Sequence, residues 1–242
     1  MRGAAACARV TSITNVTGGA PACRWLKLVH IAWTDEEARP RMWEACERVS
    51  TRKEGEEEGE RAADAVAVFA RLLSSSTKTS EEKRSRSLPT TAKTVLVAQF
   101  RPPVNRVMIE LPAGLIDAGE SAEVAALREL KEETGYQGVV RRVSPVVFSS
   151  PGMTNESMQL VEVDVDANLE CNMKPVAQPE EGECIERMVV ECGHGGEMLL
   201  SEIERIRKER GFDVDARLWS LAAGMEMAAS AATAASSSQP RT

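Results

Sequence analysis

Three glutamates in the middle of the chain have the spacing of a cation-binding helix face. Glu129, Glu132 and Glu133 lie in one short charged run, and a helix advancing about 100° per residue would hold them within an arc of roughly 100°. Carboxylates this close raise each other's pKa unless a cation lies between them. Hard divalent ions such as Mg²⁺ accept such oxygen ligands together with substrate phosphates. The alternative is a solvated acidic surface, which the three glutamates alone would favour.

The residues around the glutamates favour the cation site instead. They form one fixed-spacing pattern: Gly114, five residues, Glu120, seven residues, and then Arg128 to Tyr136, which reads Arg-Glu-Leu-Lys-Glu-Glu-Thr-Gly-Tyr. At average residue frequencies, chance would match a given window with a probability on the order of 10⁻⁸. The complete pattern resembles the signature box of the Nudix hydrolases, enzymes that cleave a nucleoside diphosphate linked to another group X.

The same residues predict how the helix begins and ends. Ser121 is a candidate N-cap, and Gly135 stands where the end of a helix favours a left-handed residue. Leu130 would face a core on the side opposite the glutamates. Arg128 would orient a neighbouring carboxylate, such as that of Glu132 one turn on, and hold it in its charged form.

Flanking stretches narrow the resemblance to one branch of the family. Residues 99–103 and 110–117 resemble the approach to the box in ADP-sugar pyrophosphatases, and residues 149–156 are similar to the Pro-Gly loop of ADP-ribose hydrolases. Residues 213–217 are similar to a stretch of eukaryotic members. The resemblance extends from about residue 24 to residue 227. It is strongest to the eukaryotic ADP-sugar (ADP-ribose) pyrophosphatases.

The resemblance implies a metal site and its ligands. The backbone carbonyl of Ala113 and the carboxylates of Glu129 and Glu133 would bind Mg²⁺, for which Mn²⁺ could substitute. Glu132 would be a further ligand and, with Arg128, part of the catalytic set.

A loop glutamate would complete the catalytic and metal-binding residues. Glu183 occupies the position in residues 179–183 that supplies a catalytic glutamate in this branch. It could deprotonate the attacking water or bind an additional metal ion that makes this water acidic. Three nearby acids, Glu180, Glu181 and Glu186, are alternatives for this role.

The resemblance also implies how the substrate is bound. Trp25 and Trp43 would stack on the two faces of the adenine, although a tryptophan is as often a core residue. In the family the N-terminal strands exchange between subunits, so that two chains build each adenine site and a homodimer is expected. The implied substrate-binding residues are Trp25, Trp43, Glu44, Arg48, Arg101, Leu115 and Ser150.

Hydrophobic patterns outside the box predict a mixed α/β protein. Helical periodicity covers residues 197–209 and 214–227, and six β-type runs cover 65–73, 94–100, 107–111, 139–148, 158–165 and 185–191. Strands interrupted by a few helices suggest a mixed sheet with helices on its faces. The resemblance implies the Nudix fold, an α/β/α sandwich around a mixed β-sheet, with an N-terminal strand extension.

Composition shifts divide the chain into segments. We expect a disordered leader at 1–23, an N-terminal strand segment for adenine binding and dimerisation at 24–53, and the Nudix domain at 54–227. Acidic and Ser-rich stretches at 54–62 and 74–92 are predicted to be flexible insertions, and the Ala- and Ser-rich residues 228–242 a disordered tail.

Charge and cysteine content exclude several classes of function. The 242 residues have a formal net charge of −7, which argues against a nucleic-acid surface, and no apolar run approaches the length of a membrane span. Six cysteines without paired spacing suggest free thiols in a reducing compartment. The expected location is therefore the cytoplasm, with the nucleus open as an additional one. The acid-free, Arg-containing leader leaves organelle targeting open.

The leading hypothesis is a Mg²⁺-dependent hydrolase that splits ADP-ribose and related ADP-sugars into AMP and a sugar phosphate. One alternative is the same chemistry on another nucleotide sugar or an oxidised nucleoside diphosphate. The other is a Nudix domain that binds ADP-ribose without cleaving it, although every carboxylate of the box is present.

Overall fold

The computed structural model describes residues 23, 25–48, 63–74, 92–180, 182–192 and 197–237. Nearly all of the predicted leader lies outside the described residues. So do the acidic insertion at 54–62, most of the insertion at 74–92, and Glu181.

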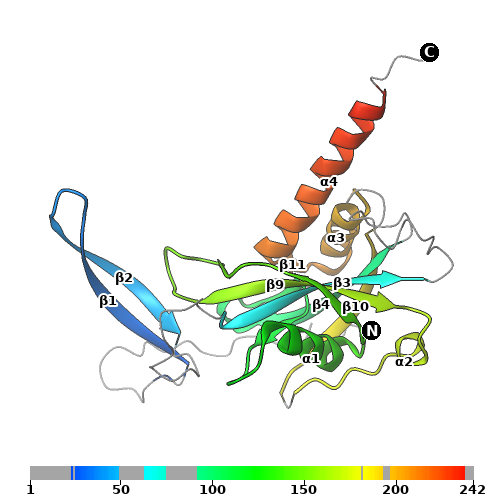
Figure 1. Ribbon diagram of the computed structural model, residues 1–242, viewed down its shortest axis with the longest axis horizontal. Coiled ribbons are helices and arrows are strands. Elements are labelled where there is room, and N and C mark those ends of the chain that lie inside the picture. Colours follow the sequence, from blue (N-terminus) through cyan, green and yellow to red (C-terminus); the bar gives the residue numbers. More distant parts are fainter. Residues whose placement is uncertain are drawn as a thin grey trace.

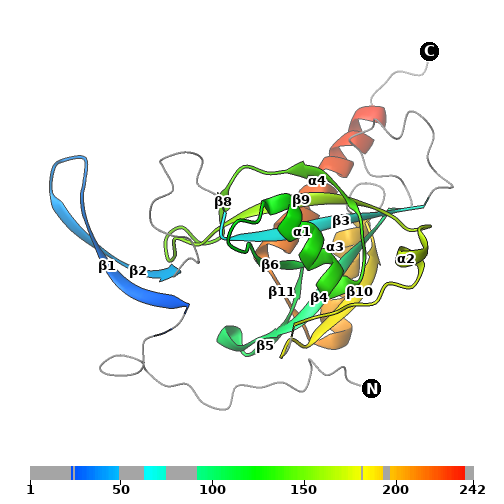
Figure 2. The same cartoon turned by 60° about the horizontal axis from the view of Figure 1, so that its bottom comes forward.

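A mixed sheet forms the centre of the fold (Figures 1 and 2). Within the described residues it has nine strands, in the order β11-β5-β4-β3-β9-β7, with β10 paired to β4, β6 to β3 and β8 to β9. The pairs β3–β9 and β5–β11 are parallel, and the others are antiparallel. The strands are β3 (Ala65–Leu73), β4 (Lys93–Arg101), β5 (Arg106–Glu110), β6 (Ala113–Leu115), β7 (Val139–Val143), β8 (Val147–Phe148), β9 (Ser157–Asp166), β10 (Ile185–Glu191) and β11 (Asp213–Val214).

Helices cover both faces of this sheet, each over its own hydrophobic core. Helix α1 (Ala122–Thr134) lies on one face, and α3 (Glu197–Arg210) and α4 (Ala216–Ser237) lie on the other (Figure 1). Alternation along β3 supplies both cores, because Val66 and Val68 pack with Leu130 of α1 whereas Ala67 packs with Leu218 of α4. The α/β/α sandwich around a mixed sheet is thus confirmed. A short helix, α2 (Glu170–Met173), follows β9.

The ends of α1 follow the sequence prediction. The Ser121 hydroxyl accepts a hydrogen bond from the Val124 amide at 3.4 Å. At the other end Gly135 has φ of 78°, and its N–H donates to the Lys131 carbonyl at 2.8 Å. A residue with a side chain would be strained at this φ. The two caps fix the length of the helix that carries the glutamates.

The predicted run 139–148 is interrupted, and the structure has β7 and β8 in its place. Pro145 stands in the break and has no N–H for a ladder hydrogen bond. Ser144 pairs with β9 in another way: its amide donates to the Leu160 carbonyl, and its hydroxyl accepts from the Leu160 amide, both at 2.9 Å.

The prediction that the tail is disordered from residue 228 is wrong for its first part. Helix α4 continues to Ser237, and its second half projects from the body of the molecule (Figure 1). The apolar periodicity of this helix ends at residue 227, and the prediction relied on that periodicity alone. Alanine has the highest intrinsic helix propensity, and this propensity favours a helical conformation for the Ala-rich run that follows.

An N-terminal hairpin projects from the body in both views (Figures 1 and 2). Its strands β1 (Leu26–Thr34) and β2 (Pro40–Arg48) form a two-stranded antiparallel sheet, which an isolated bridge between Cys46 and Thr154 connects to the rest of the described chain. Asp35 fixes the turn, because its carboxylate accepts the amides of Glu37 and Arg39 at 3.0 and 2.9 Å. The expected N-terminal strand extension is therefore present.

The hairpin exposes apolar side chains on both of its faces. Leu28 and Met42 lie on one face, and Ile31 and Trp43, which are directly opposite each other, lie on the other. A two-stranded hairpin is marginally stable without further packing.

No helix in the described ranges combines the length and the apolar character that a bilayer crossing requires.

The packing of α4 predicts where this helix tolerates substitution. Leu218 is fully buried in the core beneath α3 and α4, whereas Met227 is 72% exposed. We expect Leu218→Ala to lower the free energy of unfolding by about 2–5 kcal/mol, through lost burial and the cavity left behind. Met227→Ala, the matched control, should change it by less than about 0.5 kcal/mol. Urea denaturation measures both, and equal effects would contradict the assigned packing.

Candidate active site

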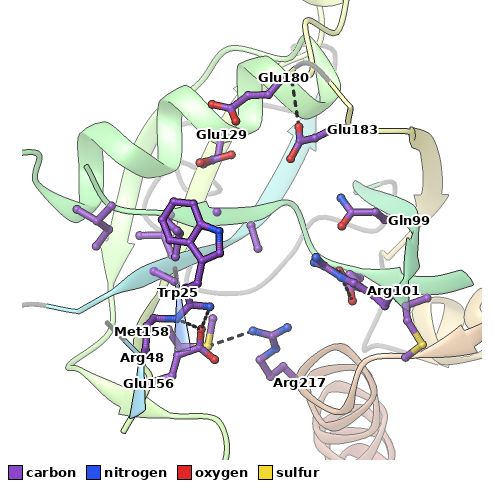
Figure 3. A pocket seen from close by; sticks show the side chains of 18 of the residues that line it. Trp25, Arg48, Gln99, Arg101, Glu129, Glu156, Met158, Glu180, Glu183 and Arg217 are labelled. Carbon is purple, nitrogen blue, oxygen red and sulfur yellow. Dashed lines mark hydrogen bonds and ion pairs between the residues drawn. The ribbon is translucent and has the colours of Figure 1, made fainter. Parts of the chain in front are cut away.

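A pocket of about 690 Å³ opens beside the box helix (Figure 3). Its walls come from the end of β4, from β5 and β6, from α1, from the loop before β10 and from the start of α4, with Trp25 over one side. The charged residues that line it include Arg48 at the end of β2 and Glu156 just before β9. The others are Arg101, Glu110, Asp117, Arg128, Glu129, Glu180, Glu183 and Arg217.

The strand β6 and helix α1 meet at Gly114. A Cβ atom on this glycine would lie 2.0 Å from Glu129 Oε1, so the Glu129 carboxylate rests directly against the backbone of β6. Next to it, the Ala113 amide donates to Glu133 Oε2 at 3.0 Å. The glycine of the box is required here because it leaves room for a carboxylate.

Arg128 joins the loop and the carboxylates into one unit. Its Nε and Nη2 donate to the two oxygens of Glu120 at 3.0 and 2.9 Å, and Nη2 also donates to the Leu115 carbonyl at 2.8 Å. Its Nη1 donates to Glu129 at 2.7 Å and to Glu132 at 3.1 Å. The predicted contact with Glu132 is present. The hydrogen bonds from Arg128 lower the pKa of Glu120.

Burial disfavours the charged form of the two glutamates nearest β6. Burial is the largest cause that raises the pKa of Glu133, to about 8, and the charges of Glu129 and Glu183 raise it further against the Ala113 hydrogen bond. Burial likewise raises the pKa of Glu129, although Arg128 opposes this. A cation bound beside these carboxyl groups would favour their charged forms and lower both pKa values.

The donor atoms fit a hard divalent cation. In the part of the chain that the structure describes, no three His, Cys, Asp or Glu side chains converge as a preformed ligand cluster. Arg128 instead donates to the carboxylates of Glu129 and Glu132, and the Ala113 amide donates to that of Glu133. All three offer oxygen ligands, the type that Mg²⁺ prefers, and Gly114 leaves room for the Glu129 carboxylate against β6.

Two of the four candidate loop glutamates reach the pocket (Figure 3). Glu183 and Glu180 line it, and the Glu180 amide donates to Glu183 Oε2 at 3.1 Å. Glu186 instead pairs with Arg210 at 2.8 Å, and Glu181 lies outside the described residues. Of the two, Glu183 is the one whose charge raises the pKa of Glu129 and of Glu133.

Both predicted substrate-binding arginines reach the pocket, each held by its own carboxylate (Figure 3). Arg101 donates to buried Glu110 through Nε at 3.0 Å and Nη2 at 2.5 Å. Arg48 contacts Glu156 Oε1 through Nε at 2.8 Å and Nη2 at 2.7 Å. Trp25 lies in the same pocket, 48% exposed.

The other predicted substrate-binding residues lie elsewhere in the single chain. Trp43 lines a separate hollow of about 330 Å³ between the hairpin and residues 151–155, and its Nε1 donates to the Gly152 carbonyl at 3.0 Å. Glu44 lies on the exposed hairpin, 3.4 Å from His30 Nε2. The carbonyl of Ser150 closes the turn at 151–154 by accepting the Met153 amide at 2.9 Å. One chain thus gathers Trp25, Arg48, Arg101 and Leu115, but not Trp43, Glu44 or Ser150.

Sequence reasoning missed the carboxylate partners of the arginines and one arginine. Glu110 and Glu156 belong to stretches that the resemblance singled out, and so does Arg217, but none was given a role. Arg217 lines the pocket, and Asp215 holds it at 2.7 Å. The pattern of residues 213–217 could have drawn attention to Arg217, whereas nothing local connects Arg48 to Glu156, 108 positions later.

Comparisons with known proteins agree with this site. A family model for the NUDIX domain matches residues 84–191. An ADP-ribose pyrophosphatase of Saccharomyces cerevisiae is 39% identical over 206 residues, 85% of this chain and 79% of that protein. An ADP-sugar pyrophosphatase of Mus musculus is 34% identical, over 81% of this chain and 79% of that protein. An uncharacterized Nudix hydrolase of Schizosaccharomyces pombe is 35% identical, over 84% of this chain and 86% of that protein.

The similarity covers most of each relative's length, and the family model spans β4 to β10 with the box helix and the loop before β10. This chain therefore belongs to the Nudix hydrolase family.

Proposed function

We propose that this enzyme hydrolyses ADP-ribose and related ADP-sugars to AMP and a sugar phosphate, with Mg²⁺ as its cofactor. The observation that carries the proposal is a single pocket in which Glu129 of the box and the loop glutamates Glu180 and Glu183 lie opposite arginines and an exposed tryptophan (Figure 3). Relatives named ADP-ribose and ADP-sugar pyrophosphatase support the same substrate class.

The charges of the pocket support the cation requirement. Among the described residues, six carboxylates and four arginines line it, so a diphosphate would enter a site that is already negative. Divalent ions bound there would neutralise the diphosphate and polarise its phosphorus–oxygen bonds. We propose that the Ala113 carbonyl and the carboxylates of Glu129, Glu132, Glu133 and Glu183 hold them.

The side chains of the chain itself bind and orient the substrate. Arg101 and Arg48 would bind phosphate oxygens, since their carboxylate partners fix the guanidinium planes. Trp25 would stack on the base. Glu183 would accept a proton from the attacking water or help to hold a cation that acidifies it.

We further propose that the enzyme is a homodimer whose second subunit completes the substrate site. The exposed apolar faces of the hairpin and its separate two-stranded sheet support a partner surface. Trp43, Glu44 and Ser150, which lie outside the pocket of their own chain, would then reach the pocket of the partner subunit.

The state of the cysteines supports a reducing compartment. Cys46, Cys171, Cys184 and Cys192 are free thiols, as is Cys23, and reduced cysteines are typical of cytoplasmic and nuclear proteins. We propose the cytoplasm as the site of action, without excluding the nucleus.

A substrate panel tests the proposed activity directly. The purified chain is incubated with ADP-ribose, other nucleotide sugars and an oxidised nucleoside diphosphate, with Mg²⁺ or with EDTA, and the products are separated by chromatography. We expect AMP and ribose 5-phosphate from ADP-ribose, and no turnover in EDTA. Binding of ADP-ribose without any product would support the sensor alternative, and faster turnover of a non-adenine substrate would reassign the specificity.

The carboxylates of the box should control turnover rather than folding. We expect Glu129→Gln and Glu133→Gln each to lower kcat by at least about 10²-fold, because they remove oxygen ligands that hold charge-stabilising cations. Exposed Glu123 in the first turn of the same helix is the matched control, and Glu123→Gln should retain full activity. Near-normal kcat in both variants at saturating Mg²⁺ would contradict the metal assignment.

A methyl group at Gly114 should displace the Glu129 carboxylate without unfolding the chain. The added Cβ would lie 2.0–2.5 Å from the carboxylate atoms, and the flexible end of Glu129 can move aside. We expect Gly114→Ala to lower kcat by about 10²-fold, as a misplacement of about 1 Å typically does. The control is Gly224→Ala, where a Cβ would meet no atom within 4 Å. Thermal melting compares both variants, and full activity of Gly114→Ala would contradict the close packing.

A subunit-mixing experiment tests the shared substrate site. If Trp25 and Trp43 stack on one adenine from different subunits, Trp25→Ala should raise KM by roughly 10- to 100-fold and change kcat little, since a lost stacking face removes binding of about 1–3 kcal/mol. In a heterodimer of Trp25→Ala and Trp43→Ala chains, one site would carry both defects and the other neither.

Mass spectrometry can confirm that the subunits have exchanged before activity is measured. The mixture should regain a low-KM fraction that neither parent variant shows. Exchanged heterodimers without low-KM activity would mean that one chain builds the whole site.

A further inference from the structure

Three arginines of the pocket, Arg48, Arg101 and Arg217, are each held by a carboxylate in the same arrangement. In Arg48 and Arg101 the partner carboxylate binds the Nε and Nη2 groups. This leaves the Nη1 amino group on the opposite edge of the guanidinium plane, where it can donate to a ligand. Each carboxylate therefore fixes the orientation of its arginine and leaves one edge of the guanidinium group available to a ligand.

Arg217 repeats this arrangement from the start of α4. Its Nε donates to Asp215 Oδ1 at 2.8 Å, and its Nη2 donates to Asp215 Oδ2 at 2.7 Å. Asp215 is itself fixed, since its Oδ1 accepts the amides of Arg217 and Leu218 at 2.8 and 3.3 Å. The guanidinium is thus locked to the first turn of a helix whose Leu218 is fully buried.

The remaining amino group of Arg217 has a poor partner. Its Nη1 donates to the Met158 thioether sulfur at 3.3 Å, and such a sulfur is a weak acceptor. Arg217 lines the pocket on the side of Arg48 and Glu156, away from Glu129 and Glu183 (Figure 3). An arginine fixed in this way gains more from an anionic oxygen than from a thioether.

We propose that Arg217 binds the phosphate group attached to the nucleoside of the substrate, through Nη1. This inference rests on the proposed function and assigns a phosphate contact at the end of the pocket remote from the box carboxylates. Arg217, Arg48 and Arg101 would then form a three-arginine phosphate site, each member presented by its own carboxylate. The alternative role is structural: Arg217 would only hold Asp215 at the start of α4.

Binding of AMP and adenosine in EDTA separates these two roles. The two ligands share the base and ribose and differ by the phosphate, and without divalent ions the protein alone must bind that phosphate. We expect Arg217→Gln to weaken AMP binding at least about 10-fold by calorimetry, as loss of a charge-assisted hydrogen bond does. Adenosine binding should stay within about 2-fold. The matched control is Arg205→Gln, because Arg205 is exposed on α3 and pairs with Glu202 and Glu209.

Arg217→Lys keeps the inference testable if the glutamine variant fails to fold. Lysine retains the positive charge, but its single ammonium group cannot bind Asp215 and a ligand at once through two different edges, as a guanidinium group can. We expect it to weaken AMP binding about 3- to 10-fold and to raise KM for ADP-ribose more than it lowers kcat. Equal AMP affinity in Arg217→Lys and the wild type, or equal weakening of AMP and adenosine, would overturn the phosphate contact.

The result also distinguishes failure of this inference from failure of the proposed function. A wild-type enzyme that neither binds AMP nor hydrolyses ADP-ribose would overturn the proposed function. A wild type that does both, alongside an Arg217→Gln variant that binds AMP as well as Arg205→Gln does, would overturn only the role of Arg217.

Discussion

The guanidinium of Arg128 is the interaction on which the site depends. It binds Glu120 and the Leu115 carbonyl on the loop after β6 and, with its other amino group, Glu129 and Glu132 on α1. Arg128 therefore adds three hydrogen bonds between the loop and the helix to the backbone contact of β6 with Glu133. Because four of its partners are oxygens that carry or share negative charge, the same side chain keeps carboxylates close together that would repel one another.

Pairing every pocket arginine with a carboxylate leaves the site short of positive charge. Arg128 cannot neutralise Glu133, whose raised pKa, about 8, reflects burial and the neighbouring charges of Glu129 and Glu183. Arg48, Arg101 and Arg217 have a defined orientation, because a carboxylate binds one edge of each guanidinium group. The protein thus orients the arginine side chains that face the substrate, whereas the proposed divalent cation would supply the missing positive charge. This division explains why an acidic protein can present a site for an anionic substrate.

Local signals in the sequence were sufficient for the box helix, but not for the contacts between distant segments. Ser121 and Gly135 identify the helix ends because capping depends on neighbouring residues only. The pairing of Arg48 with Glu156 depends on where the hairpin meets the turn at 151–154, and no local pattern records that. At the end of α4 the local signal was present but was not used: the Ala-rich run has a high helix propensity, and the helix continues through it to Ser237.

The position of the hairpin connects the stability of the fold to the completeness of its site. Arg48 is anchored to Glu156, and the Cys46 amide donates to the Met153 carbonyl at 2.7 Å, so the end of β2 is tied to the body while its tip is not. That anchor places Trp25 and Arg48 in the pocket of the same chain and directs Trp43 away from it. The exposed apolar faces and Trp43, which lies outside the pocket that holds Trp25, thus belong to the same two strands. A partner that covered this hairpin would supply both requirements at once, which favours a site built from two chains over one built from a single chain.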